Sequence, residues 1–127
     1  MFNSRGGLPS LVLAVAVAGS VAVATPSAAH HSFALFDSGK TVTLEGTVGK
    51  FEWTNPHSWI YLEVAASGRT TEEWEIELPS AGVLAREGWN KNFVKIGDRI
   101  SVYVHPLKSG AKAGSLESFT PQANAKN

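Results

Sequence analysis

The chain of 127 residues contains no cysteine, and its single methionine is the first residue. Disulfide bonds, thiolate metal sites and thiol nucleophiles are therefore excluded. The chain also lacks an excess of charge, because 11 Lys and Arg balance 11 Asp and Glu. Zero net charge argues against a nucleic-acid-binding protein and against a polybasic membrane-surface protein, since both need clustered positive charge. The length fits one domain.

The sequence also lacks an apolar run long enough to span a bilayer, which takes about 20 residues. The longest run, Leu11 to Ala24, has 14 residues. Arg5 precedes it, and the small residues Ser27 and Ala29 follow, as in a secretory signal peptide. We predict a signal peptide over residues 1–29, cleavage before His30, and export to the periplasm or the cell exterior without stable membrane insertion. A cut at the end of the apolar run is the alternative.

The rest of the chain is dominated by the two-residue alternation typical of β-strands. It predicts strands near residues 41–53, 60–64, 74–78, 100–104 and 116–120, with a bulge at Gly49 in the first. A helix is expected over 81–87, with Ser80 as N-cap and Gly88 just beyond its end. This order predicts an all-β fold with one short helix, a small five-stranded OB-like Greek-key barrel.

The predicted barrel spans residues 41–120, after an N-terminal segment at 30–40 and before a flexible tail at 121–127. Its expected core is apolar and drawn from four strands and the helix. The residues are Val42, Leu44, Ile60, Leu62, Trp74, Ile76, Leu78, Leu84, Ile100, Val102 and Val104.

The four histidines are the most unusual reactive groups. His30 and His31 begin the predicted mature chain, His57 ends the turn after the first strand, and His105 ends the fourth strand. In an OB-fold the loops at His57 and His105 flank one binding face, so we expect these side chains near each other. The other interpretation is structural: each histidine only hydrogen-bonds within its own turn or strand end.

A free N-terminal histidine chelates metal ions through its amino group and one ring nitrogen, and a further imidazole completes a T-shaped set. This arrangement resembles the histidine brace of secreted copper proteins, and nitrogen ligands of this kind suit Cu(II). The sequence therefore predicts a copper site formed by His30 with His57, His105 or both, and with His31 as an additional ligand. Metal handling is the expected role.

Aromatic residues favour a second hypothesis, a metal-free module that binds a small ligand or a protein partner. Trp59 and Tyr61 follow the turn at His57 and could form a stacking surface. The alternating Glu73, Glu75 and Glu77 are expected to form a solvent-exposed strand face. No carboxylate pair or serine triad is recognisable, so no catalytic residue is predicted and enzymatic activity is left open.

Three strings carry a resemblance to a known family: AHHSF at residues 29–33, FEWTNPHSW at 51–59 and VHPLK at 104–108. They resemble a family of small exported bacterial proteins of unknown function. The resemblance covers nearly all of residues 29–120. It implies export and no particular activity.

Overall fold

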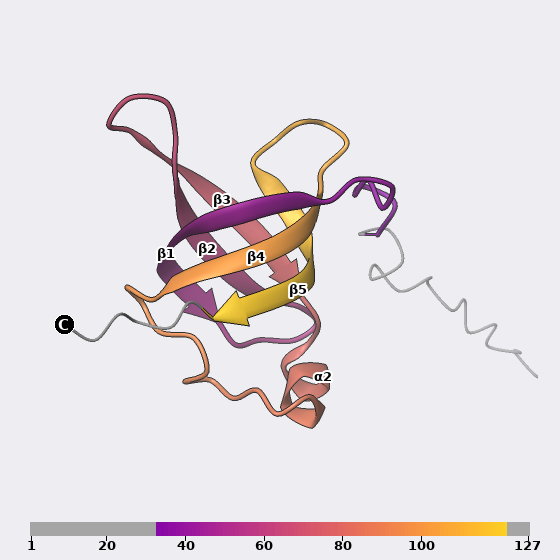
Figure 1. The fold of residues 1–127 in the computed structure, drawn as a ribbon. Coiled ribbons are helices and arrows are strands. Elements are labelled where there is room, and N and C mark those ends of the chain that lie inside the picture. The colour runs from indigo at the N-terminus through magenta and orange to yellow at the C-terminus, as the bar shows by residue number, and fades with distance from the viewer. Residues whose placement is uncertain (1–32, 122–127) are drawn as a thin grey trace, which may run out of the picture.

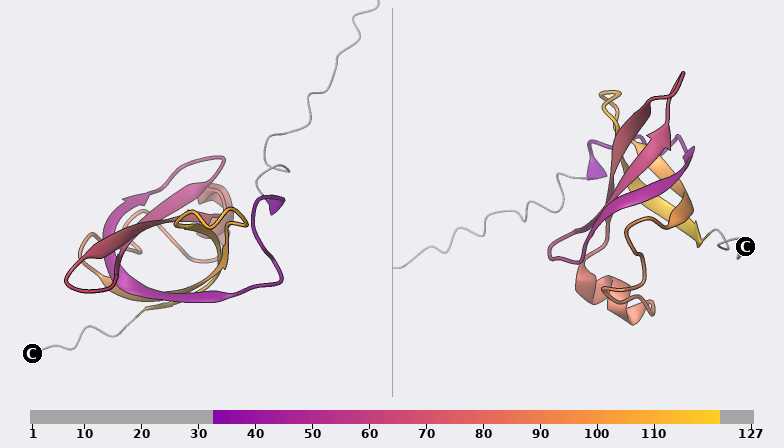
Figure 2. Two further views of the ribbon diagram at one scale, coloured as in Figure 1. Left: turned by 90° about the horizontal axis from the view of Figure 1, so that it is seen from above. Right: turned by 90° about the vertical axis from the view of Figure 1, so that its left-hand side faces the viewer.

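The computed structural model describes residues 33–121, which form five strands and one short helix (Figure 1). The elements are β1 (Val42–Glu52), β2 (Ser58–Ala65), β3 (Thr71–Leu78), α2 (Ala81–Arg86), β4 (Arg99–Pro106) and β5 (Ala113–Pro121). The strands close into a barrel in the order β1-β2-β3-β5-β4, and Figure 2 shows the ring of strands from above. This closed five-stranded barrel, with its helix between β3 and β4, is the OB-fold predicted from the sequence.

β1 closes the barrel by pairing with both β2 and β4. Its register with β2 shifts between Val48 and Lys50, which places the bulge at Gly49, as predicted. A second glycine, Gly46, faces a crowded position, because a Cβ there would collide with the carbonyl oxygen of Glu63. The bulge bends the strand, and Gly46 allows the backbones of β1 and β2 to approach closely.

The predicted end signals of the helix are both present. The Ser80 side chain accepts a hydrogen bond from the backbone N–H of Val83, as an N-cap does. Gly88 has φ +91°, a conformation that favours glycine. After it, residues 89–98 pass beneath the barrel to β4 (Figure 2) and are anchored by Val94, which is 3% exposed.

The core contains every residue predicted for it, although Val42 and Trp74 are only partly buried. Val48 and Val94 are also buried there and were not on the predicted list. The last strand begins at Ala113 and not near Leu116, because backbone pairing with Glu75 extends it toward its N-terminus. No helix within residues 33–121 has the length and apolar character needed to cross a membrane.

Candidate functional site

The turn between β1 and β2 is held by its own side chains. The Thr54 hydroxyl donates to the carbonyl oxygen of His57 at 2.6 Å. The buried Ser58 hydroxyl accepts from the Thr54 N–H and donates to the Thr54 carbonyl, each at 3.2 Å. The bond between Asn55 and Pro56 is cis. The hydrogen bonds of Thr54 and Ser58 fix the backbone that carries His57.

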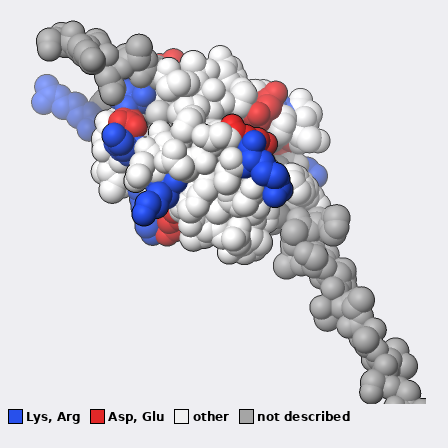
Figure 3. All heavy atoms as spheres, turned by 90° about the horizontal axis from the view of Figure 1, so that it is seen from below, with Lys and Arg blue, Asp and Glu red and all other residues white. Residues whose placement is uncertain are grey.

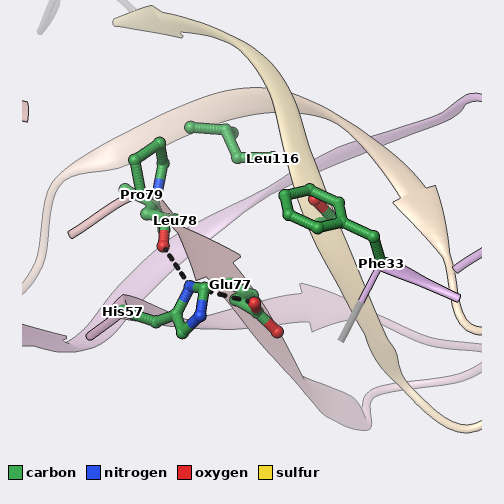
Figure 4. Close-up of a pocket in the computed structure, with 7 residues that line it drawn as sticks. Phe33, His57, Glu77, Leu78, Pro79 and Leu116 are labelled. Atoms are coloured by element: carbon green, nitrogen blue, oxygen red, sulfur yellow. Dashed lines mark hydrogen bonds and ion pairs between the residues drawn. The ribbon is translucent and has the colours of Figure 1, made fainter. Parts of the chain in front are cut away.

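The His57 ring lies against the end of β3. Its Nδ1 is 3.0 Å from Oε1 of Glu77 and 3.4 Å from the carbonyl oxygen of Leu78 (Figure 4). A carboxylate and a backbone carbonyl are both acceptors, so Nδ1 carries the hydrogen. In the neutral ring the lone pair is then on Nε2, the nitrogen that remains for a ligand.

The prediction that Glu73, Glu75 and Glu77 form a solvent-exposed strand face is wrong for Glu77. Glu73 and Glu75 are exposed, whereas Glu77 is only 9% exposed. Glu75 and Glu77 both pair with β2 and with β5, but only Glu77 has the His57 ring beside it, with Nδ1 at 3.0 Å from its carboxylate. Strict alternation assigns all three glutamates to one face, but it does not reveal which part of that face other segments cover.

His57 and Glu77 border a cavity of about 130 Å³. The other lining residues come from three separate parts of the chain, and most of them are apolar (Figure 4). They are Phe33, Leu78, Pro79, Ser115 and Leu116. The cavity thus joins a histidine–carboxylate pair to the first residue of the described chain.

Phe33 is brought to the cavity by a segment that runs along the end of β4. Phe36 forms an isolated antiparallel bridge with Leu107 and is 7% exposed. The N–H of Asp37 donates to Pro106, and Lys108 donates to the carbonyl oxygens of Leu35 and Ala34 through its N–H and its Nζ. These contacts hold residues 34–37 on the barrel and direct the chain toward the cavity.

His105 has a different environment. Its Nδ1 lies 2.9 Å from the carbonyl oxygen of Lys40, just before β1, and therefore donates to it. Its Nε2 is 4.0 Å from Oε2 of Glu117, which also accepts a 2.8 Å hydrogen bond from Thr41. His105 thus ties the start of β1 to the end of β4, and its imidazole has no partner in common with that of His57.

Trp59 and Tyr61 do not line the cavity. Lys50 lies over the Tyr61 ring at 5.1 Å and forms an ion pair with Glu52, whose carboxylate accepts from the Tyr61 hydroxyl at 3.4 Å. Burial raises the pKa of Tyr61, and the hydrogen bond to Glu52 raises the pKa of Lys50. Trp59 is half-buried between Glu52 and Glu77. One face of the predicted stacking surface is thus covered by Lys50.

Two predicted ligands, His30 and His31, lie outside the described residues, as does the predicted signal peptide. Within residues 33–121, no three His, Asp or Glu side chains gather closely enough to hold a metal ion. Sequence reasoning missed Glu77 as a partner of His57. No local signal separates it from Glu73 and Glu75, because all three share one alternation.

A family of unknown function, DUF6152, matches residues 17–117. The chain belongs to this family. Membership in DUF6152 confirms the predicted resemblance to an uncharacterised family and supplies no activity. No curated protein matches the chain in sequence.

Among solved structures, the dimeric structure of the N-terminal domain of PriB protein from Thermoanaerobacter tencongensis is similar to this DUF6152 chain. The TM-score is 0.47 and the sequence identity 19%, over 67% of this chain and 98% of that one. The OB-fold assignment rests on the strand pairing and not on this similarity.

Proposed function

We propose that this protein is an exported metal-binding protein that holds one copper ion through His30, at its mature N-terminus, and His57. Its role is metal handling in the periplasm or outside the cell. The observation that carries the proposal is the contact between His57 and the buried carboxylate of Glu77. The proposal extends to no catalytic activity.

The surroundings of His57 support a role as metal ligand, because a carboxylate and a backbone carbonyl lie beside one nitrogen of its ring. Metal-binding histidines usually donate the N–H of one ring nitrogen to a carboxylate or carbonyl, which orients the ring and raises its basicity. The Nδ1 of His57 has both kinds of acceptor, at 3.0 Å and 3.4 Å. Its Nε2 is then the coordinating nitrogen, and the cavity beside it gives access.

The path of the chain supports His30 as the second ligand residue. Phe33 borders the same cavity as His57, and an extended chain covers about 3.3–3.6 Å per residue. His30 is three residues before Phe33, so about 10 Å of extended chain is the most that separates it from the cavity wall. His31 is closer along the chain and is proposed as an additional ligand.

The donor set favours copper over harder cations. An amino group and two imidazoles provide three nitrogen ligands, and Cu(II) ranks highest among the divalent first-row metals for such ligands. The set depends on cleavage before His30, because an uncleaved chain has an amide in place of the amino group. Of the two internal histidines we assign the ligand role to His57, since His105 does not line the cavity.

Processing is tested first. Mass spectrometry of the exported protein should give a mature chain that begins at His30. A chain that begins at Thr25, or one that retains Arg5, contradicts the proposed amino-terminal ligand.

Copper binding is then tested by titrating Cu(II) into two purified forms in competition with a chelator. The form beginning at His30 should bind one Cu(II), and a form with Met-Gly added before His30 should bind far more weakly. The matched control carries the same dipeptide after Asn127 and should bind like the native chain. Equal affinity of the native and N-terminally extended forms contradicts the proposal. A flat titration of both forms favours the metal-free binding module.

A further inference from the structure

The loop after α2, together with the last residue of α2 and the first residue of β4, concentrates basic charge in a chain with no net charge. Residues 86–99 contain four of the 11 Lys and Arg but only two of the 11 Asp and Glu. All four basic residues are exposed, and none forms an ion pair with a carboxylate in the described part of the chain. They are Arg86, Lys91, Lys95 and Arg99. The neutral total charge therefore conceals a local basic surface.

Large apolar side chains lie within the same loop. Ile96 is 75% exposed and Phe93 is 42% exposed, which makes them two of the five exposed large hydrophobic residues in residues 33–121. Ile96 occupies a turn closed by the hydrogen bond from the N–H of Asp98 to Lys95. Turns usually carry polar residues or glycine, so the fold itself gives no reason for isoleucine at this position.

The loop is held firmly on the barrel. Gly97 donates to the carbonyl of Val48, and Val48 donates to the carbonyl of Asp98. The Phe93 ring stacks on Trp89 with a centroid distance of 4.2 Å, and Trp89 contacts Phe119 at 5.2 Å. Because these contacts fix the loop, Ile96 and the outer part of Phe93 are presented to solvent.

Figure 3 views the molecule from this end of the barrel. Lys and Arg side chains, with Asp and Glu beside several of them, stand around a broad uncharged area that shows no deep hollow in this view. Apolar side chains that protrude between basic ones are typical of proteins that dock on anionic bilayers, where the apolar groups enter the interface and the basic groups contact lipid headgroups.

We propose that the loop of residues 86–99 docks the protein on an anionic phospholipid surface, with Ile96 and Phe93 entering the headgroup region. Arg86, Lys91, Lys95 and Arg99 contact the lipid phosphates. The turn that carries His57 lies at the same end of the barrel as α2 and the start of β4, but none of the docking residues lines the cavity beside His57. The vesicle test uses no metal, so its outcome is separate from that of the copper titration.

The test is cosedimentation of the purified exported protein with phosphatidylcholine vesicles, with and without 30% phosphatidylglycerol. The native protein should bind the anionic vesicles at low salt, bind pure phosphatidylcholine poorly, and be released as salt screens the charges. Replacement of Ile96 by aspartate should weaken binding about tenfold or more. The double variant Lys91→Glu and Lys95→Glu should weaken it at least about 25-fold, since each basic residue lost costs roughly fivefold and each new carboxylate adds repulsion.

Matched controls make the same kinds of change at the other end of the barrel: Leu35→Asp matches Ile96→Asp, and Lys40→Glu matches Lys91→Glu made alone, which should weaken binding at least about fivefold. Leu35→Asp and Lys40→Glu alter exposed residues there and should leave vesicle binding almost unchanged. Thermal unfolding of each variant checks that it is folded, which is expected since all the substituted side chains are exposed. All forms share one N-terminus, so differences in vesicle binding among them are due to the substituted residues.

Failure of the native protein to bind anionic vesicles overturns the proposal, as does equal binding by the loop variants. The proposal is also overturned if the native chain binds an acidic protein but no vesicles, and the loop variants lose that protein binding. The surface is then assigned to a protein partner.

Discussion

The two internal histidines have similar backbone surroundings and different side-chain partners. In both, Nδ1 donates to a backbone carbonyl, that of Leu78 for His57 and that of Lys40 for His105. Only His57 also has a buried carboxylate at 3.0 Å, whereas the nearest carboxylate to His105 is exposed, 4.0 Å away, and bonded to Thr41. The partner of the imidazole therefore distinguishes His57, a candidate metal ligand, from His105, which connects two strands by hydrogen bonding.

The largest effect is expected from the core that supports both histidines. Ile76 is fully buried and adjacent to Glu77, but its side chain is on the opposite face of β3. Ile76→Ala should lower the free energy of unfolding by about 2–5 kcal/mol, as chemical denaturation can measure. Under conditions where the variant is folded, it should still bind one Cu(II). Complete loss of binding by the folded variant would show that the site depends on more than the residues on the outer face.

The two histidines should differ most clearly in how much their replacement by alanine lowers the copper affinity. Loss of a carboxylate that supports a ligand typically weakens metal binding about 10–100-fold, and removal of the ligand itself should cost at least the upper end of that range. Competition titrations of His57→Ala and His105→Ala, done side by side, measure the difference. Equal affinities in the two variants would refute the assignment.

Glu77→Gln tests the carboxylate without removing the hydrogen-bond acceptor. It should weaken Cu(II) binding about 10–100-fold, because the neutral amide supports the imidazole less than a carboxylate does. Glu117→Gln, the matched change beside His105, should leave the copper affinity unchanged. If Glu117→Gln has the larger effect, the site lies at the other histidine.

The smallest effect is expected from His105→Ala. Removing the hydrogen bond to Lys40 should lower the free energy of unfolding by about 1 kcal/mol, with little change in copper affinity. Thermal unfolding gives the first quantity and the competition titration the second. A large fall in copper affinity at unchanged stability would return His105 to the set of ligands.

The fold could be predicted further than the site. Alternation and turn residues placed all five strands, and the signals at Ser80 and Gly88 placed the helix, because these features are local in the sequence. The site depends on contacts between distant segments. Nothing local shows that β5 and the chain at Phe33 come to the end of β3 beside Glu77.

The expectations for the two internal histidines and for Trp59 and Tyr61 were also limited by contacts between distant segments. Loop positions in a general OB-fold suggested that His57 and His105 lie together. Ser115 pairs with His105 and also lines the cavity beside His57, but the two imidazoles contact different carbonyls and carboxylates. Trp59 and Tyr61 were placed correctly on β2, yet the cover of Lys50 over Tyr61 depends on the register between β1 and β2. Such contacts depend on the register between neighbouring strands. Alternation along one strand does not define that register.

Electron paramagnetic resonance of the Cu(II) complex tests the central claim most directly, because nitrogen hyperfine splitting reports the number of nitrogen ligands. The protein beginning at His30 should show three nitrogens from His30 and His57, and a fourth where His31 also binds; His57→Ala should show one fewer, while His105→Ala should match the native spectrum. Identical spectra for the native protein and His57→Ala would contradict the claim that His57 coordinates the copper.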